Sequence, residues 1–276
     1  MRKVLLATTA LVAVTGVTAA HADISISGNI EFEFESQDAG TDTMSTDGQL
    51  IVESSMTADS GVTYGVTYAQ KMEASGVDQF NASISSPEMG TVLLGNHNDN
   101  GPGMIDGSLG RNNDIESENY NANAETALTG LSGDMITYVS PSIGGLTVAA
   151  SSNANTDMSG FGARYTMSGM EVYFGSVEDQ QNMGVKTSIA GLTVAVGAKN
   201  VDGSTAKSND IALKYTLGNG VTLAGVSARG TTSANAKVKY SNIGAKYAIA
   251  PGVAAKLEAG ENDGAGYTYV SFDVNF

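Results

Sequence analysis

The last eleven residues, Gly266-Tyr-Thr-Tyr-Val-Ser-Phe-Asp-Val-Asn-Phe276, form the stretch of sequence that decides the fold. Thr268 and the apolar residues up to Phe276 alternate with Tyr, Ser, Asp and Asn. A period of two places successive side chains on opposite faces of a strand, so one face meets an apolar environment and the other meets water. The sequence ends on an aromatic residue without a polar tail. This ending suits a strand that closes a barrel in a lipid bilayer better than a strand of a soluble sheet.

The N-terminal residues 1–22 have the layout of a secretory signal peptide. The basic pair Arg2-Lys3 precedes an apolar run over 4–20, and Ala20-His21-Ala22 supplies a small-x-small cleavage site. We therefore expect export and a mature domain of residues 23–276. A single membrane-spanning helix is the alternative for this run, but no basic flank or stop-transfer pattern follows it.

Composition excludes several classes of protein. The formal charge of −15 becomes −17 once the two bases of the leader are removed, and phosphates repel such a surface, which argues against nucleic acid as a partner. The chain has no Cys, so neither disulfides nor thiol chemistry are available. Beyond the leader, no segment approaches the roughly 20 apolar residues of a membrane-spanning helix, although alternating strands would still be compatible with a membrane.

Short alternating runs fill the rest of the chain. In each run the apolar residues share one parity, and polar residues occupy the other. The count is sixteen, and an even number suits an antiparallel barrel with both termini on one side. The runs lie at 24–34, 50–56, 62–68, 80–84, 92–94, 136–138, 146–148, 161–165, 170–174, 185–189, 192–196, 211–215, 221–223, 243–249, 253–257 and 268–276.

The connections between these runs alternate in length. Gly, Asn and Pro mark tight turns at 59–61, 86–90, 140–145, 168–169, 190–191, 218–220 and 250–252. Longer polar connections lie near 36–48, 72–77, 152–158, 199–207, 230–236 and 261–265. The sequence therefore predicts an all-β fold, a 16-stranded antiparallel transmembrane β-barrel with short periplasmic turns and long external loops. A secreted or surface-attached β-sandwich that binds or adheres is the alternative.

One connection, residues 98–133, is much longer than the others. A structureless loop of this length is uncommon and usually functional. A solvated external loop is the simpler interpretation, and its carboxylates could also hold Ca²⁺, although no EF-hand spacing is present. Asp99 and Asp106 are candidate Ca²⁺ ligands, as are Asp38, Asp42 and Asp47 in the first loop. The charged residues of the long connection are Asp99, Asp106, Arg111, Asp114, Glu116, Glu118 and Glu125.

Together, the sixteen runs, the terminal Phe276 and the long third external connection resemble the general porins of Gram-negative outer membranes. The leader run Lys3-Val-Leu-Leu-Ala-Thr-Thr-Ala-Leu-Val12 and Asp23-Ile-Ser-Ile-Ser-Gly-Asn29 are most similar to the alphaproteobacterial, Rhodobacter-like branch. The resemblance implies a homotrimer of water-filled barrels in the cell outer membrane, each narrowed by a third loop folded into the lumen. It also implies that the barrel-assembly machinery reads the closing strand as a signal, here Phe272, Val274 and Phe276.

If the apolar parity faces lipid, the opposite parity lines the pore. The resemblance implies loop acids that face a cluster of bases across the constriction, which orders water and favours polar solutes. This sequence departs from that arrangement, because acids stand on the early strands where the family concentrates arginine. With 29 acids against 12 mature bases we expect a cation-preferring pore. The lumen-wall candidates are Glu31, Glu33, Glu53, Arg164, Glu171, Lys186, Lys214, Lys246 and Lys256, although a solvated surface charge is the alternative for each lysine.

Signals for an enzyme are weak. The mature chain has one histidine, His97, which a catalytic triad or metal site would have to use alone. No G-x-S-x-G is present, and 101–107 lacks the dinucleotide-binding spacing. We expect a passive channel for small hydrophilic solutes and ions, without a cofactor apart from a possible structural Ca²⁺.

Overall fold

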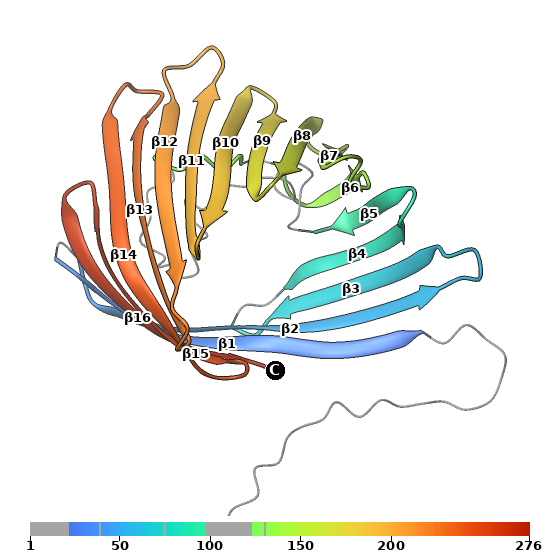
Figure 1. The fold of residues 1–276 in the computed structure, drawn as a ribbon, viewed down its shortest axis with the longest axis horizontal. Coiled ribbons are helices and arrows are strands. Elements are labelled where there is room, and N and C mark those ends of the chain that lie inside the picture. Colours follow the sequence, from blue (N-terminus) through green and yellow to red (C-terminus); the bar gives the residue numbers. More distant parts are fainter. Residues whose placement is uncertain (1–21, 39, 74–75, 98–122, 130) are drawn as a thin grey trace, which may run out of the picture.

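The computed structural model describes residues 22–38, 40–73, 76–97, 123–129 and 131–276, and the described residues form one closed antiparallel barrel (Figure 1). Each strand pairs with its neighbours in the sequence, and β1 pairs with β16. The predicted 16-stranded barrel is confirmed, and the alternative of two packed sheets is wrong. The strands are β1 (Asp23–Gln37), β2 (Thr43–Thr57), β3 (Thr63–Lys71), β4 (Val77–Ser86), β5 (Gly90–Asn96), β6 (Asp134–Val139), β7 (Leu146–Asn153), β8 (Met158–Met167), β9 (Met170–Val177), β10 (Gln180–Ile189), β11 (Leu192–Val201), β12 (Lys207–Thr216), β13 (Val221–Thr231), β14 (Lys237–Ala250), β15 (Val253–Asn262) and β16 (Ala265–Asn275).

Alternation along each strand separates an inner face from an outer face. In β16, Tyr269 is 1% exposed whereas Phe272 is 40% exposed, and the same contrast recurs around the barrel. A closed sheet buries the side chains that point inward, so the exposed apolar parity is the outer surface. The outer surface is therefore apolar and the interior carries most of the polar groups. This arrangement is that of a barrel surrounded by lipid.

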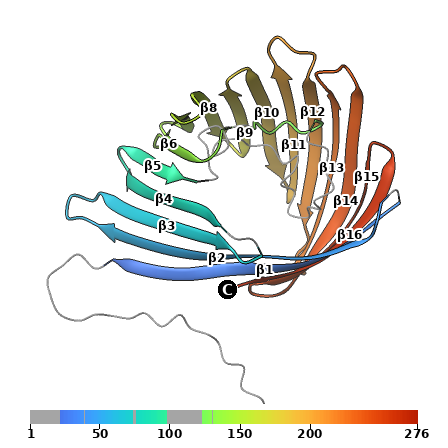
Figure 2. The same cartoon turned by 180° about the vertical axis from the view of Figure 1, so that it is seen from behind.

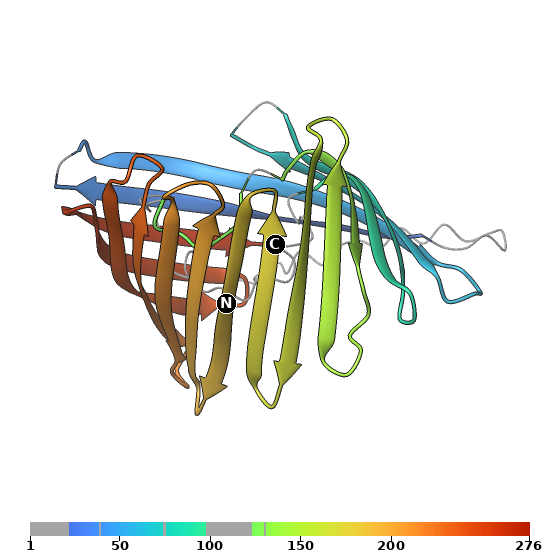
Figure 3. The same cartoon turned by 90° about the horizontal axis from the view of Figure 1, so that it is seen from above.

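The first and last strands form the closing seam. Nine residue pairs from Asn29↔Asn275 to Gln37↔Tyr267 join β1 to β16, and Phe276 exchanges two backbone hydrogen bonds with Gly28 (2.9 and 3.0 Å). A Cβ on Gly28 would lie 2.8 Å from the Phe276 ring, so the absent side chain leaves room for that ring on the outer surface. Figure 3 shows the long blue strands β1 and β2 beside the red strands of the seam. Pairing at the seam removes both open edges of the sheet.

Strand boundaries differ from the expected ones in the polar connections. The connection expected over 36–48 spans only 38–42, and the one expected over 261–265 spans only 263–264. Backbone pairing continues into polar sequence because ladder hydrogen bonds do not require apolar side chains. Polar residues such as Glu35 and Asp47 therefore belong to strands, and most connections at both ends of the barrel are short.

The tight turns have the backbone angles that two-residue hairpins need. Ser168 and Gly169 have φ of 48° and 80°, and Ala190 and Gly191 have φ of 50° and 83°. Positive φ at both central residues gives a type I′ turn, whose twist matches that of the strands. These two turns lie at the end of the barrel that carries both termini, as predicted for the tight turns.

Large outward side chains include aromatic residues at both ends of the barrel. Tyr165, Tyr215 and Tyr247 lie close to the end with the termini, whereas Phe80 and Phe161 lie close to the opposite end, and all five are exposed. Aromatic girdles of this kind mark the two interfaces of a membrane barrel. Among the described residues, the structure has no helix that is long and apolar enough to span a membrane.

Candidate functional site

The end of the long connection lies against the inner wall. We call residues 123–129 the docked segment, and its trace crosses β10 to β12 in both Figure 1 and Figure 2. The hydroxyl of Thr126 donates to Oδ2 of Asp210 on β12 (2.6 Å), and Nδ2 of Asn182 on β10 donates to the carbonyl of Thr126 (3.0 Å). Both wall residues are buried, so the docked segment occupies the inside of the barrel.

Further wall side chains hold the backbone of the docked segment. Nζ of Lys199 on β11 donates to the carbonyl of Ala127 (2.9 Å), and the hydroxyl of Ser208 on β12 donates to the carbonyl of Glu125. Gln180 on β10 binds Thr129 through both ends of its amide. Side chains of three strands therefore satisfy backbone groups that the segment's irregular conformation leaves without partners in a ladder.

Glycines on the wall leave room for this segment. A Cβ on Gly230 of β13 would lie 2.0 Å from the carbonyl oxygen of Asn123. A Cβ on Gly197 of β11 would meet Oγ1 of Thr126 at 2.7 Å and the hydroxyl of Tyr173 at 2.9 Å. Any side chain at these positions would push the segment away from the wall. The glycines thus set how closely the segment and the wall approach each other.

Two apolar clusters support the same placement. Ala124 is fully buried in a cluster with residues of β11 to β14 and β16, including Tyr240 and Tyr269. Leu131, in the same connection, packs with Met135 of β6 and Val177 of β9. The described residues of the long connection therefore contact the inner wall at several points rather than lying outside the barrel.

A charged cluster lines the inside of the closing seam. Nζ of Lys256 on β15 lies 2.8 Å from Oε1 of Glu31 on β1 and 3.0 Å from Oδ2 of Asp273 on β16. The hydroxyl of Tyr269 donates to Glu31 (2.9 Å) and to Glu33 (2.8 Å). Lys256 thus contacts two carboxylates and Tyr269 links a third to them, so the cluster holds three acids and one base.

More acids extend this negative wall. Glu33 also accepts a hydrogen bond from Ser45 of β2 (2.7 Å), and Glu35 follows on the same inner face of β1. Asp47 of β2 is the cross-strand partner of Glu31. Oε1 of Glu258 accepts a hydrogen bond from the hydroxyl of Tyr267 (2.6 Å). We call Glu31, Glu33, Glu35, Asp47 and Asp273 the acidic wall.

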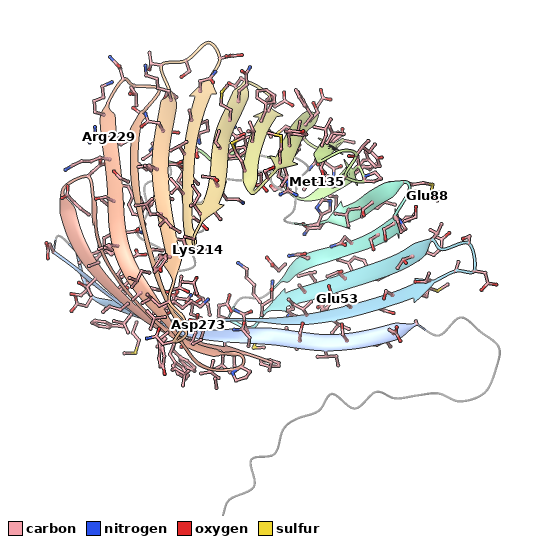
Figure 4. All side chains as sticks on the ribbon, in the orientation of Figure 1. Glu53, Glu88, Met135, Lys214, Arg229 and Asp273 are labelled. Atoms are coloured by element: carbon pink, nitrogen blue, oxygen red, sulfur yellow. The ribbon has the colours of Figure 1, made fainter. Side chains whose placement is uncertain are left out.

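Bases on the predicted lumen parity lie on the later strands. On β8 to β10, Glu171 pairs with Lys186 (2.9 Å) and more weakly with Arg164 (3.8 Å). Lys214 of β12 and Lys246 of β14 stand on the inner parity, each opposite inner-face residues of β13. Figure 4 labels Lys214 and Glu53 on opposite sides of the central opening.

The other sequence candidates divide into two groups. Glu53 lies on the inner parity of β2, because its ladder partner Thr67 is in turn opposite the buried Asn81. Glu125 is buried in the docked segment. The remaining loop candidates, Asp99, Asp106, Arg111, Asp114, Glu116 and Glu118, lie outside the described residues.

Several inner residues were missed by the sequence analysis. Glu35, Asp210 and Glu258 each lie one residue beyond a predicted run on the inner parity, so extending the alternation would have found them, whereas Asp273 lies within the run 268–276 on its polar face but was not among the lumen-wall candidates. The partners of Asp210 could not be found in this way, because Thr126 lies in a segment without periodicity. Contact between such a segment and the wall depends on the tertiary structure.

Candidate metal ligands are not clustered in the described part of the chain, where no group of three or more His, Cys, Asp and Glu could hold a metal ion. Asp47 lies on β2 and not in the first loop, which separates it from Asp38 and Asp42. Near the mouth, the backbone N–H groups of Glu73 itself and of Gly48 donate to the Glu73 carboxylate and lower its pKa from the ordinary value. This acid therefore stays ionised in mildly acidic solution.

Comparison with known proteins gives a consistent result. Solved structures of Rhodopseudomonas blastica porin variants superpose with TM-scores of 0.73 and 0.74 at 15% sequence identity, covering 92% of this chain and 100% of theirs. OmpT, an outer-membrane protein of Vibrio cholerae in a trimer form, superposes with a TM-score of 0.73 at 10% identity, covering 92% of this chain and 99% of its own. A comparison with curated protein sequences returns no match.

The family profile described as Gram-negative porin matches residues 7–267, which include nearly the whole barrel and the inner wall described above. The closed sheet, its apolar outer surface and the polar interior with a docked segment agree with that match. The chain belongs to the Gram-negative porin family and forms an outer-membrane channel.

Proposed function

We propose that this porin is a cation-preferring, water-filled channel through which small hydrophilic solutes and ions diffuse passively across the outer membrane. The observation that carries the proposal is the acidic wall, where Lys256 is the one base in contact with Glu31 and Asp273 among the described residues. Fixed negative charge that lines a narrow passage concentrates cations and excludes anions. The net charge of −17 expected for the mature chain acts in the same direction.

The bases on the later strands do not cancel this effect. Glu171 lies between Arg164 and Lys186 and neutralises part of their charge. Lys214 of β12 and Lys246 of β14 lie on the β15 side of the acidic wall, and Lys246 is the cross-strand partner of Lys256, so the field inside the barrel runs from these later strands toward the acids of β1 and β2. A field of this kind orients polar solutes and disfavours the passage of apolar solutes.

Export and assembly follow from the same proposal. Residues 1–22 are a cleaved signal peptide, the barrel-assembly machinery reads the closing strand through Phe272, Val274 and Phe276, and three copies associate as a trimer. The trimer form of the structurally similar Vibrio cholerae protein supports the last point. The long connection is the constriction loop, with Ca²⁺ at Asp99 and Asp106 as a remaining proposal.

A planar bilayer tests the function directly. Purified protein should insert and produce stepwise conductance increments, and the zero-current potential in a KCl gradient should have the sign of cation preference. Silent bilayers would contradict the channel, whereas anion preference would contradict only the selectivity. A Glu31→Gln/Glu33→Gln variant should shift the zero-current potential toward anion preference. Asp59→Asn, in a turn outside the barrel strands, is the matched control and should leave that potential unchanged.

A further inference from the structure

Four bases gather on the outer surface at the end of the barrel opposite the termini. Lys207 of β12, Arg229 of β13, and Lys237 and Lys239 of β14 are all exposed and share the outward parity of their strands. Figure 4 labels Arg229 at the outer edge of the wall, near the turn from β13 to β14. We call these four residues the rim patch. Among the described strands, every other Lys or Arg stands on the inner parity.

Strand register brings the rim patch together. Arg229 is directly opposite Lys239, and both Lys207 and Lys237 are partners of Thr231 on the two sides of β13. Like charges directly opposite each other destabilise a sheet. A chain with so few bases therefore concentrates a third of its mature complement at one destabilising place. A bound anion would remove that repulsion.

One base of the rim patch, Lys239, has acidic partners of its own. Glu261 pairs with Nζ of Lys239, and Oδ1 of Asp263 accepts the backbone N–H of Lys239 (2.7 Å). Asp202 accepts hydrogen bonds from the amides of Gln181 and Asn200. Nζ of Lys237 donates to the hydroxyl of Thr231 (3.0 Å), and neither Lys237 nor Lys207 forms an ion pair with an acid among the described residues. Arg229 has no acidic partner among the described residues.

The surface around the rim patch is hollowed. A hollow of about 640 Å³ is lined by the three bases Arg229, Lys237 and Lys239 and by one acid, Asp263, with Gly230 and Val238 beside them. A second hollow, of about 420 Å³, is lined by Lys207, Lys237 and the turn residues 202–206, which include Asp202. Both hollows are large enough for a phosphate group and have donors on more than one side.

An apolar furrow lies beside the rim patch on the membrane side. It measures about 440 Å³ and forms where Gly225 and Ser227 of β13 leave space between the larger Leu213, Leu223 and Ile243. Gly225 precedes Arg229 by four residues on the same outer face, which places the furrow about 13 Å from the patch along the strand. A headgroup at the patch and an acyl chain in the furrow are therefore within the reach of one lipid.

We infer that the rim patch and the furrow together bind one phosphate-bearing lipid of the external leaflet. The phosphate lies among Arg229, Lys237 and Lys239, and an acyl chain follows β13 over Ser227 and Gly225. Paired Lys and Arg at a membrane interface recognise anionic headgroups by charge, and the apolar furrow selects a lipid over a free anion. The inference rests on the outer-membrane placement under the proposed function, with the termini on the periplasmic side.

Native mass spectrometry of the detergent-solubilised protein tests this binding. The probes are dioleoylphosphatidic acid, dioleoylphosphatidylcholine and inorganic phosphate at equal concentration. The wild type should retain phosphatidic acid in preference to the other two. Arg229→Gln/Lys237→Gln should lower that retention roughly 10–30-fold, since each base near an anionic headgroup contributes measurably to binding. Lys71→Gln, an exposed lysine on the inner parity of β3, is the matched control and should bind like the wild type.

A Ser227→Leu variant examines the furrow without changing charge, and it should also lower phosphatidic acid retention. Equal retention of both lipids by the wild type, or wild-type retention by the double variant, would overturn the inference. Inorganic phosphate that binds as well as phosphatidic acid would overturn the lipid assignment. Bilayer conductance of the same preparations is measured separately. A wild type that retains no phosphatidic acid but conducts normally contradicts only this inference, whereas silent bilayers contradict the proposed function.

Discussion

Lys256 is the residue on which the inner charge of the seam depends. Its ammonium lies between Glu31 and Asp273, and the side chains of the three residues are 13%, 22% and 12% exposed. Removing one partner from a partly buried charge cluster leaves the remaining charges without compensation. Here the two carboxylates that remain belong to the first and last strands.

We therefore expect Lys256→Met to lower the free energy of unfolding by roughly 2–4 kcal/mol, as measured by urea titration in lipid vesicles. The same variant should increase cation preference, because the acidic wall loses its nearest base. Lys246→Met is the control, because Lys246 is opposite Lys256 and its removal relieves a like-charge contact. Equal destabilisation by the two variants would contradict a specific role for Lys256.

Phe276 acts at the same scale but on the outer surface. Its backbone pairs with Gly28 and its ring occupies the space above that glycine. Deleting Phe276 should lower the fraction of folded barrel recovered from outer membranes, and Phe276→Ala should do so less strongly because it keeps the two backbone hydrogen bonds. Any barrel that forms should have wild-type single-channel conductance.

The control for Phe276 is Phe161→Ala. Phe161 is 53% exposed on the outer surface, close to the 58% of Phe276, but it lies on β8 away from the seam. An equal loss of folded protein in the two variants would mean that the general loss of an outer aromatic ring, and not the seam, explains the effect.

The docked segment shows how elements of the barrel cooperate. It is held by side chains of β10, β11 and β12, and glycines on β11 and β13 leave the space that it occupies. Because the segment has no ladder of its own, its position depends on these few contacts. The free energy that holds it is therefore small and local, and single substitutions should change its mobility without unfolding the barrel.

Asp210→Ala should weaken the docking by about 1–3 kcal/mol, because Thr126 loses a charged acceptor. We expect larger open-channel current noise and a changed single-channel conductance in planar bilayers. Asn209→Ala, the exposed neighbour on the outer face of β12, should leave both unchanged. Wild-type noise in the Asp210 variant would show that Asp210 does not hold the segment.

The elements were largely predictable and the docking was not. Alternation located all sixteen strands, because a barrel between lipid and water imposes a period of two on each one. Alternation also predicted that Glu31 and Lys256 both face the interior. It could not predict their contact, because the register across the seam depends on the tertiary structure. Polar ends such as Thr43–Gly48 lacked an apolar signal and were assigned to loops, whereas backbone pairing extends the strands through them.

At the scale of the whole molecule, a closed sheet gives resistance to denaturants. Every strand has two paired neighbours, so unfolding must break the ladder at two places before one strand can leave. We expect the trimer to remain assembled in cold SDS and to migrate at the monomer position only after boiling. Migration at the monomer position without heating would contradict the trimer. It would not contradict the barrel, whose β-sheet content circular dichroism would then measure.

The seam between β1 and β16 has a consequence for how the chain folds. Its contacts join residues more than two hundred positions apart, such as Tyr269 and Glu31. Such contacts carry the largest loop-closure entropy and the highest contact order, so they form late. The chain must therefore remain unaggregated until its C-terminus arrives. Its strong negative charge makes copies of the chain repel one another, which opposes aggregation before the seam has closed.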